Sequence, residues 1–134
     1  MKTCAKAFTD KLTSEDLKYE VKELNDETLV IFPYDNRETV LAFSGDDGEY
    51  VQMMTVIESM MDDERFVVAV LACNQQNRRY RFVRFFVDDD NDIRAFTDAF
   101  LDVNSAGEMC FGLLVRSLNI IKEARSEIME LIYS

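Results

Sequence analysis

The chain has 134 residues, of which 26 are acidic and 15 basic, so its formal net charge is −11, and its hydrophobic content is 48%. This length is typical of one domain, and the apolar content can form a core without metal or disulfide bonds. The negative charge repels phosphate backbones and anionic lipid head groups, which disfavours nucleic-acid and membrane binding. We therefore expect a single domain over residues 1–134 that binds neither.

The three cysteines, Cys4, Cys73 and Cys110, are odd in number and irregularly spaced, which is typical of reduced thiols rather than of a disulfide or zinc framework. The first twelve residues mix charged with apolar side chains, so they lack the apolar centre of a signal peptide. No apolar run approaches the roughly 20 residues that span a bilayer. These observations predict a cytoplasmic protein.

The first half of the chain predicts one helix and four strands. Residues 2–15 place Ala5, Phe8 and Leu12 at helical spacing. After them the pattern changes to alternation or to runs of β-branched and aromatic residues, separated by short polar turns. The predicted strands cover residues 19–24, 29–34, 39–43 and 50–57, and the turns between the last three cover residues 35–38 and 45–48. Strands in this order form an antiparallel meander.

The middle segment fits a helix or a strand, because residues 65–72 are rich in valine. Ser59 or Asp62 can cap a helix, and Asp63 and Glu64 suit the positive end of its dipole. These signals favour a helix over residues 62–77, in which the large apolar side chains line one face. The strand alternative for residues 65–72 stays open at this point.

The last third predicts a hairpin and a long helix. Residues 80–87 and 93–101 read as two strands joined by the acidic turn 88–92. Ser105 stands three residues before Glu108, the spacing of a capping box, and an apolar stripe at helical spacing continues to about Tyr133.

The fold class predicted from these elements is α+β. An antiparallel sheet of about five to six strands packs against N-terminal, middle and long C-terminal helices, in the order α-β-β-β-β-α-β-β-α. The last helix is longer than such a sheet needs as cover. Four residues of its apolar stripe are therefore candidates for a dimer or client surface: Phe111, Leu114, Leu118 and Ile121.

Catalytic signals are missing from the sequence. The chain contains no histidine, which removes the usual general base and the usual activator of Ser or Cys nucleophiles. The acidic turn 88–92 is not a calcium-binding EF-hand, because Ile93 occupies the place of the turn glycine and Ala99 that of the bidentate glutamate. We expect no enzyme activity, no cofactor and no metal site.

Two clusters are candidate binding groups. The basic residues Arg78, Arg79, Arg81 and Arg84 could hold a carboxylate or phosphate, since guanidinium groups bind such anions bidentately. The alternative, which we favour, is that they pair with the acidic turn and neighbouring acids. Methionine suits adaptable surfaces, but for Met53, Met54, Met60 and Met61 core filling is favoured over a binding groove.

One stretch of sequence is distinctive: residues 74–82 (NQQNRRYRF) run into residues 85–90 (FFVDDD) and Ile93. Together with the order of elements along nearly the whole chain, this stretch resembles the YbjN family, bacterial proteins labelled sensory transduction regulators. The resemblance implies a fold similar to that of type III secretion chaperones, which are small, acidic, usually dimeric proteins that hold a segment of a client. It supplies no catalytic residues.

Two hypotheses for the function follow. The first is a non-enzymatic, chaperone-like interaction or regulatory module, expected to be a homodimer, that holds a protein or peptide segment on a sheet edge or an apolar helix surface. The alternative is a sensor that binds a small anion through Arg78, Arg79, Arg81 and Arg84.

Overall fold

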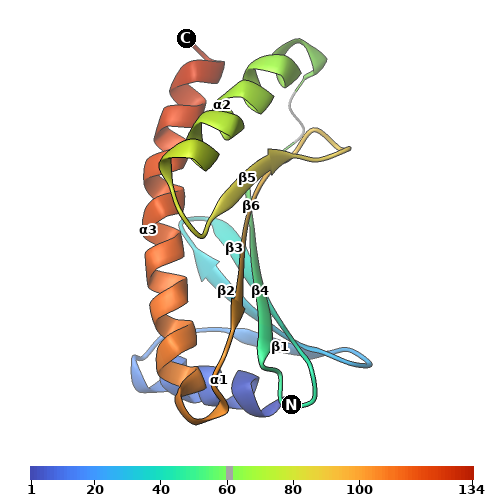
Figure 1. The fold of residues 1–134 in the computed structure, drawn as a ribbon, viewed down its shortest axis with the longest axis vertical. Coiled ribbons are helices and arrows are strands. Elements are labelled where there is room, and N and C mark those ends of the chain that lie inside the picture. The colour runs from blue at the N-terminus through green and yellow to red at the C-terminus, as the bar shows by residue number, and fades with distance from the viewer. Residues whose placement is uncertain (60–61) are drawn as a thin grey trace.

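The computed structural model describes residues 1–59 and 62–134, and it has the predicted α+β fold and order of elements (Figure 1). Three helices accompany six strands. The elements are α1 (Thr3–Ser14), β1 (Glu20–Glu23), β2 (Thr28–Tyr34), β3 (Arg37–Ser44), β4 (Tyr50–Glu58), η1 (a 3-10 turn, Asp63–Arg65), α2 (Phe66–Arg79), β5 (Arg84–Val87), β6 (Ile93–Phe100), η2 (a 3-10 turn, Val103–Ser105) and α3 (Ala106–Ile132). The helical alternative for residues 65–72 is thus the correct one.

The six strands form one antiparallel sheet in the order β1-β2-β3-β4-β6-β5. The β2–β3 hairpin turns through only two residues, Asp35 and Asn36, whose φ angles are 51° and 62°. Positive φ at both central positions is the type I′ turn, whose twist matches that of the flanking strands. Arg37 and Glu38, predicted to lie in the loop, therefore belong to β3.

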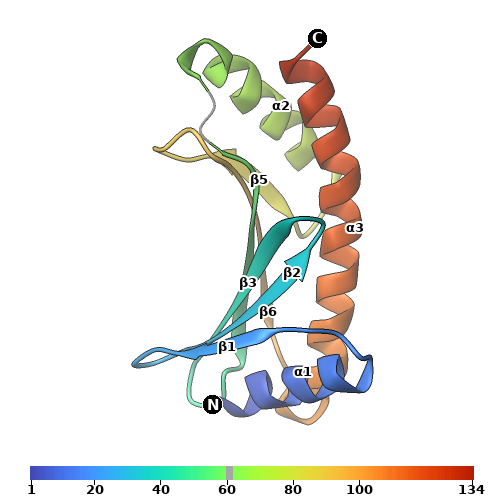
Figure 2. The same cartoon turned by 180° about the vertical axis from the view of Figure 1, so that it is seen from behind.

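All three helices lie on the same side of the sheet (Figures 1 and 2). α3 runs along this face, with α1 packed near its first turns and α2 near its last. The core between them is continuous and contains Phe8 of α1, Phe43 of β3 and both Leu114 and Ile128 of α3. At 27 residues, α3 is about 40 Å long at 1.5 Å per residue. Its length is used within the monomer, because it has to reach both other helices.

The start of α3 differs from the predicted capping box. The Ser105 side chain accepts no hydrogen bond from the helix. Instead, Asp102 caps the preceding turn η2 by accepting from the backbone N–H of Asn104 at 2.9 Å, and Glu108 pairs with Lys11 of α1 at 3.2 Å. The capping box is absent because the chain enters α3 through a 3-10 turn, which moves the cap three residues earlier.

β5 is shorter than predicted. It begins at Arg84 instead of residue 80, since Phe82 has a φ of 75°, which a strand cannot contain. Tyr80 lies outside the sheet, and its hydroxyl donates to Glu123 of α3 at 3.0 Å.

Candidate functional site

The helices leave one face of the sheet uncovered (Figure 2). Its centre is an apolar row in which Ile31, Val40, Met54 and Phe96 are successive partners across β2, β3, β4 and β6. Directly opposed residues in an antiparallel sheet point to the same side, so this row forms one strip. Phe86 of β5 extends it by stacking on Phe96, with ring centroids 5.2 Å apart. We call these five residues the sheet strip.

A second aromatic pair stands on the same face. Tyr50 and Phe100 are opposed in β4 and β6, and their rings meet edge to face at 4.5 Å. Phe100 is 68% exposed. Gln52 and Asp98 lie between this pair and the sheet strip and are hydrogen-bonded to each other at 2.8 Å. The uncovered face therefore combines apolar side chains with the Gln52–Asp98 pair and, on its β5–β6 side, with Arg84 and Arg94, of which Arg84 lies 5.4 Å from the centroid of the Phe96 ring.

The two edges of the sheet are protected against an added strand. β1 carries Glu20, Lys22 and Glu23 at one edge, and charged edge residues disfavour strand pairing. At the other edge, the side-chain amide of Asn77 hydrogen-bonds to both backbone groups of Phe85, at 2.7 and 2.9 Å. The faces of the sheet and helices are therefore better candidates for binding than its edges.

The outer face of α2 is the second apolar surface. Val67 and Leu71 are 64% and 62% exposed, and Phe66, Val68 and Val70 are each 40% exposed. The buried residues of α2 are smaller or polar: Ala69, Ala72, Cys73 and Gln76. The large apolar face predicted for this helix therefore points to solvent, because alanines let α2 approach α3 closely. We call Phe66, Val67, Val70 and Leu71 the α2 patch.

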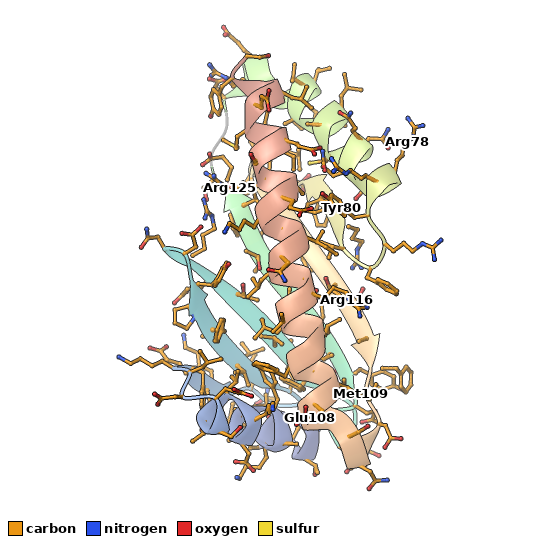
Figure 3. All side chains as sticks on the ribbon, turned by 90° about the vertical axis from the view of Figure 1, so that its left-hand side faces the viewer. Arg78, Tyr80, Glu108, Met109, Arg116 and Arg125 are labelled. Atoms are coloured by element: carbon orange, nitrogen blue, oxygen red, sulfur yellow. The ribbon has the colours of Figure 1, made fainter. Side chains whose placement is uncertain are left out.

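The predicted arginine cluster is divided by the structure. Arg79 forms an ion pair with Glu127 of α3, and Arg84 forms one with Asp98 of β6. Arg78 and Arg81 are exposed and have no ion pair within the described residues, and Figure 3 shows Arg78 directed away from α3. Two of the four thus pair with neighbouring acids, although not with those of the turn 88–92. The four do not line a common cavity among those found in the described chain.

Three of the four α3 residues predicted as a dimer or client surface are in the core. Leu114 is 1% exposed, and Leu118 and Ile121 are 6% exposed. Only Phe111 is partly accessible, and Lys11 lies 5.3 Å from its ring centroid. These three residues are buried because the face of α3 with the strongest apolar periodicity is the one that covers the sheet.

The titratable groups show no activated nucleophile or base among the described residues. Burial raises the pKa of the Cys73 thiol to about 11, and burial also raises that of Cys110. The backbone N–H of Asp92, together with Arg94 and the N–H of Asp90, lowers the pKa of Asp88, so this carboxylate stays ionised. Within residues 1–59 and 62–134, no group of three or more His, Cys, Asp or Glu side chains could hold a metal ion.

The structure tests the prediction of core filling for two of the four methionines. Met53 is buried in the core, as favoured, whereas Met54 is part of the sheet strip. Met60 and Met61 lie outside the described residues.

Comparison with known proteins identifies the family. A family model described as "YbjN: Putative bacterial sensory transduction regulator" matches residues 6–132. The chain belongs to the YbjN family. No curated protein matches it. A crystal structure described as that of YbjN, "a putative transcription regulator from E. coli", aligns with 94% of this chain and 89% of its own at 13% identity and a TM-score of 0.56.

At 13% identity, the crystal structure of E. coli YbjN supports the fold alone. The resemblance to type III secretion chaperones stays a prediction. No helix in the described part of the YbjN-family chain combines the length and the hydropathy of a membrane span.

Sequence reasoning missed the sheet strip, although a signal was present. Val40 and Ala42 alternate with the core residues Leu41 and Phe43 in β3, so this strand is apolar on both faces. A strand that is apolar on both sides is typical of a sheet covered on both sides. Here one of the two sides is open.

Proposed function

We propose that this YbjN-family protein is a non-enzymatic regulatory module that holds an apolar polypeptide segment against the open face of its sheet. The sheet strip is the observation that carries the proposal. Soluble monomers rarely leave contiguous apolar surface uncovered, and apolar surface with a polar rim marks interaction sites. The ion pairs Arg84–Asp98 and Arg94–Asp88 supply such a rim beside Phe86 and Phe96.

The missing catalytic groups also favour binding. The thiols are raised in pKa and buried, and the shifted carboxylates, Asp88 and Asp98, are shifted downward. The pKa values of catalytic acids and bases are usually shifted toward neutral pH instead. The family description, a sensory transduction regulator, is consistent with a role that requires no chemistry.

A peptide library displayed on phage tests the proposal. We expect the protein to enrich peptides with alternating or consecutive large apolar residues, and the Phe86→Asp/Phe100→Asp variant to lose this enrichment. Val103→Asp is the matched control, because Val103 is 41% exposed but belongs to η2 and not to the open face. Equal enrichment by wild type and the Phe86/Phe100 variant would reject the open face as the binding surface.

A second copy of the chain is the partner that we propose for the α2 patch. Valine is a weak helix former, and exposed valines gain no packing energy within one chain. Covering these side chains with a partner surface is therefore favoured. Opposite charges flank this patch along the chain: Glu64 of η1 and Arg78 of α2 each stand seven positions from Leu71, on opposite sides. In an antiparallel pair about a twofold axis near Leu71, each Glu64 would approach the partner's Arg78.

Charge reversal tests this dimer separately from peptide binding. We expect sedimentation velocity to show a dimer whose dissociation constant rises in Glu64→Arg and in Arg78→Glu, since each variant places like charges together. The double variant should restore the dimer, because the complementary pair is re-formed with reversed polarity. A wild-type monomer at high micromolar concentration, or a double variant no tighter than the single ones, would contradict the antiparallel pairing.

A further inference from the structure

A cavity of about 300 Å³ lies between the end of the β2–β3 hairpin and α3. Three basic side chains line it: Arg37 of β3 and Lys122 and Arg125 of α3. Asp35 is the one acidic residue in its lining. The protein as a whole carries a net charge of −11, so a cavity with two more positive than negative groups is a marked local reversal. Positive charge within a concave surface attracts small anions.

The two arginines are held side by side. The Nε atoms of Arg37 and Arg125 both donate to the backbone carbonyl of Ile57, at 3.3 and 3.5 Å. Two guanidinium groups on one carbonyl oxygen repel each other. Their acidic neighbours are distant for ion pairs: Asp35 lies 3.6 Å from Arg37, and Glu58 lies 3.9 Å from Arg125. Lys122 has no ion pair in the described part of the chain. The positive charge is therefore only partly neutralised.

The floor of the cavity offers a hydroxyl donor. Thr39 and Thr55 face each other across β3 and β4, with their hydroxyl oxygens 2.8 Å apart, and both side chains are buried. Their mutual hydrogen bond uses one of the two hydroxyl hydrogens. Within residues 1–59 and 62–134 neither hydroxyl makes another hydrogen bond, so the second hydrogen is available to an acceptor in the cavity. A buried donor without an acceptor is costly, which favours a ligand or water there.

We infer that this cavity binds a small organic anion through a carboxylate or phosphate group. The guanidinium groups of Arg37 and Arg125 and the ammonium of Lys122 would bind the charged group. The apolar side chains of Leu118 and Ile121, which also line the cavity, would contact its carbon skeleton. A volume of about 300 Å³ is at the lower end of the range for ligand pockets, so the ligand is a compact one.

This site differs from the arginine cluster predicted from the sequence. Figure 3 shows Arg125 and Arg78 on opposite sides of α3. The cavity residues come from three separate segments of the chain, namely the β2–β3 hairpin, β4 and α3, and only folding brings them together. The cavity shares no residue with the sheet strip or the α2 patch, although Arg37 and Arg125 also border a neighbouring hollow that is lined by Val40 and Met54 of the strip.

Calorimetric titration with two sets of probes tests the inference. One set contains dicarboxylates and tricarboxylates of three to six carbons, such as malonate, succinate and citrate. The other contains inorganic phosphate and small phosphate esters such as glycerol 3-phosphate. Sodium chloride of equal ionic strength serves as the reference, because it reproduces screening without bidentate binding. We expect saturable heat with at least one probe, and the set to which it belongs identifies the anionic group.

The variants connect that signal to the cavity. Lys122→Gln and Arg125→Gln should each weaken binding about tenfold, since a charge-assisted hydrogen bond is lost. Lys122 is exposed, so its replacement leaves the fold intact, and circular dichroism checks Arg125→Gln. Arg116→Gln removes the same charge from an exposed position on the opposite side of α3 from Arg125 and should leave the affinity unchanged. The inference is overturned if no probe gives saturable heat, or if Arg116→Gln weakens binding as much as Lys122→Gln.

Discussion

The side-chain amide of Asn77 substitutes for a neighbouring strand at the edge of the sheet. Its Nδ2 donates to the carbonyl oxygen of Phe85 at 2.9 Å, and its Oδ1 accepts from the N–H of Phe85 at 2.7 Å. One side chain from α2 thus satisfies both outward-facing backbone groups of Phe85, the second residue of β5. It fixes α2 to the sheet and closes the edge to strand addition.

Replacing Asn77 by alanine should destabilise the protein by about 1–3 kcal/mol, because two backbone groups that are largely removed from water lose their partners. Chemical denaturation followed by circular dichroism measures the change. Asn74→Ala on the same helix is the control, since Asn74 is exposed and its side chain makes no hydrogen bond within the described residues. If the two variants were equally stable, the Asn77–Phe85 pair would contribute nothing to the fold.

The two glycines of α3 should respond to alanine in opposite directions. A Cβ at Gly107 would lie 2.8 Å from the backbone oxygen of Ala7, whereas a Cβ at Gly112 would have no atom within 4 Å. Gly107→Ala should therefore push α3 away from α1 and destabilise by about 1–3 kcal/mol. Gly112→Ala should stabilise by about 0.5–1 kcal/mol, as expected for an exposed helix position. Thermal denaturation should show a lower melting temperature for Gly107→Ala and a higher one for Gly112→Ala. A change in the same direction for both variants would contradict the close approach of α1 and α3.

The fold class and order of elements could be predicted from the sequence because the signals are local. The hydrophobic period changes from helical to alternating near Tyr19, and polar turns separate the strands. The type I′ geometry of Asp35 and Asn36 was harder to predict, since their neighbours Arg37 and Glu38 are also polar. Only pairing with β2 shows that these two residues are part of β3.

The candidate sites could not be predicted, because they depend on which face of each element meets its neighbours. In α2 the large residues Val67 and Leu71 indicated a buried face, but the small Ala69 and Ala72 are buried instead. A helix that packs closely on another buries its small side chains, and a sequence read without its partner cannot reveal this choice. The cavity lined by Arg37 and Arg125 could not be predicted either, because these residues lie far apart in the sequence and only the fold brings them together.

Asp88 should make stability depend on pH in the acidic range. Its carboxylate accepts from the N–H groups of Asp92 and Asp90, at 3.0 and 2.9 Å, and from Arg94. These donors lower its pKa in the folded state from the usual 3.8. The unfolded state therefore binds more protons as the pH falls, so this contribution is complete above about pH 4 and is lost below it.

Asp88→Asn removes this pH dependence. We expect the difference in melting temperature between wild type and Asp88→Asn to be constant from pH 5 to pH 7, values well above about pH 4, and to shrink as the pH approaches 3. Asp89→Asn removes the same charge from the adjacent, exposed position and provides the comparison. A difference that stayed the same down to pH 3 would mean that the folded state does not favour the ionised form of Asp88.

The cysteines should be unreactive until the protein unfolds. Cys4, Cys73 and Cys110 are all buried, and burial raises the pKa of Cys73 from 9.0 to about 11. Only the thiolate reacts, so at pH 8 about one Cys73 thiol in a thousand would be reactive even if a reagent could reach it. Above the usual thiol pKa the unfolded state loses its protons first, so the free energy of unfolding should fall as the pH rises past 9.

Labelling with a disulfide reagent at pH 8 measures this reactivity. We expect no thiol to react quickly in the native protein and all three to react in denaturant. Val67→Cys supplies an internal reference, because Val67 is 64% exposed on the outer face of α2. In that variant one thiol should react at the rate of a small free thiol. Rapid labelling of a second thiol would show that α2 or α1 opens readily from α3, since Cys73 and Cys110 are covered only while those helices stay packed.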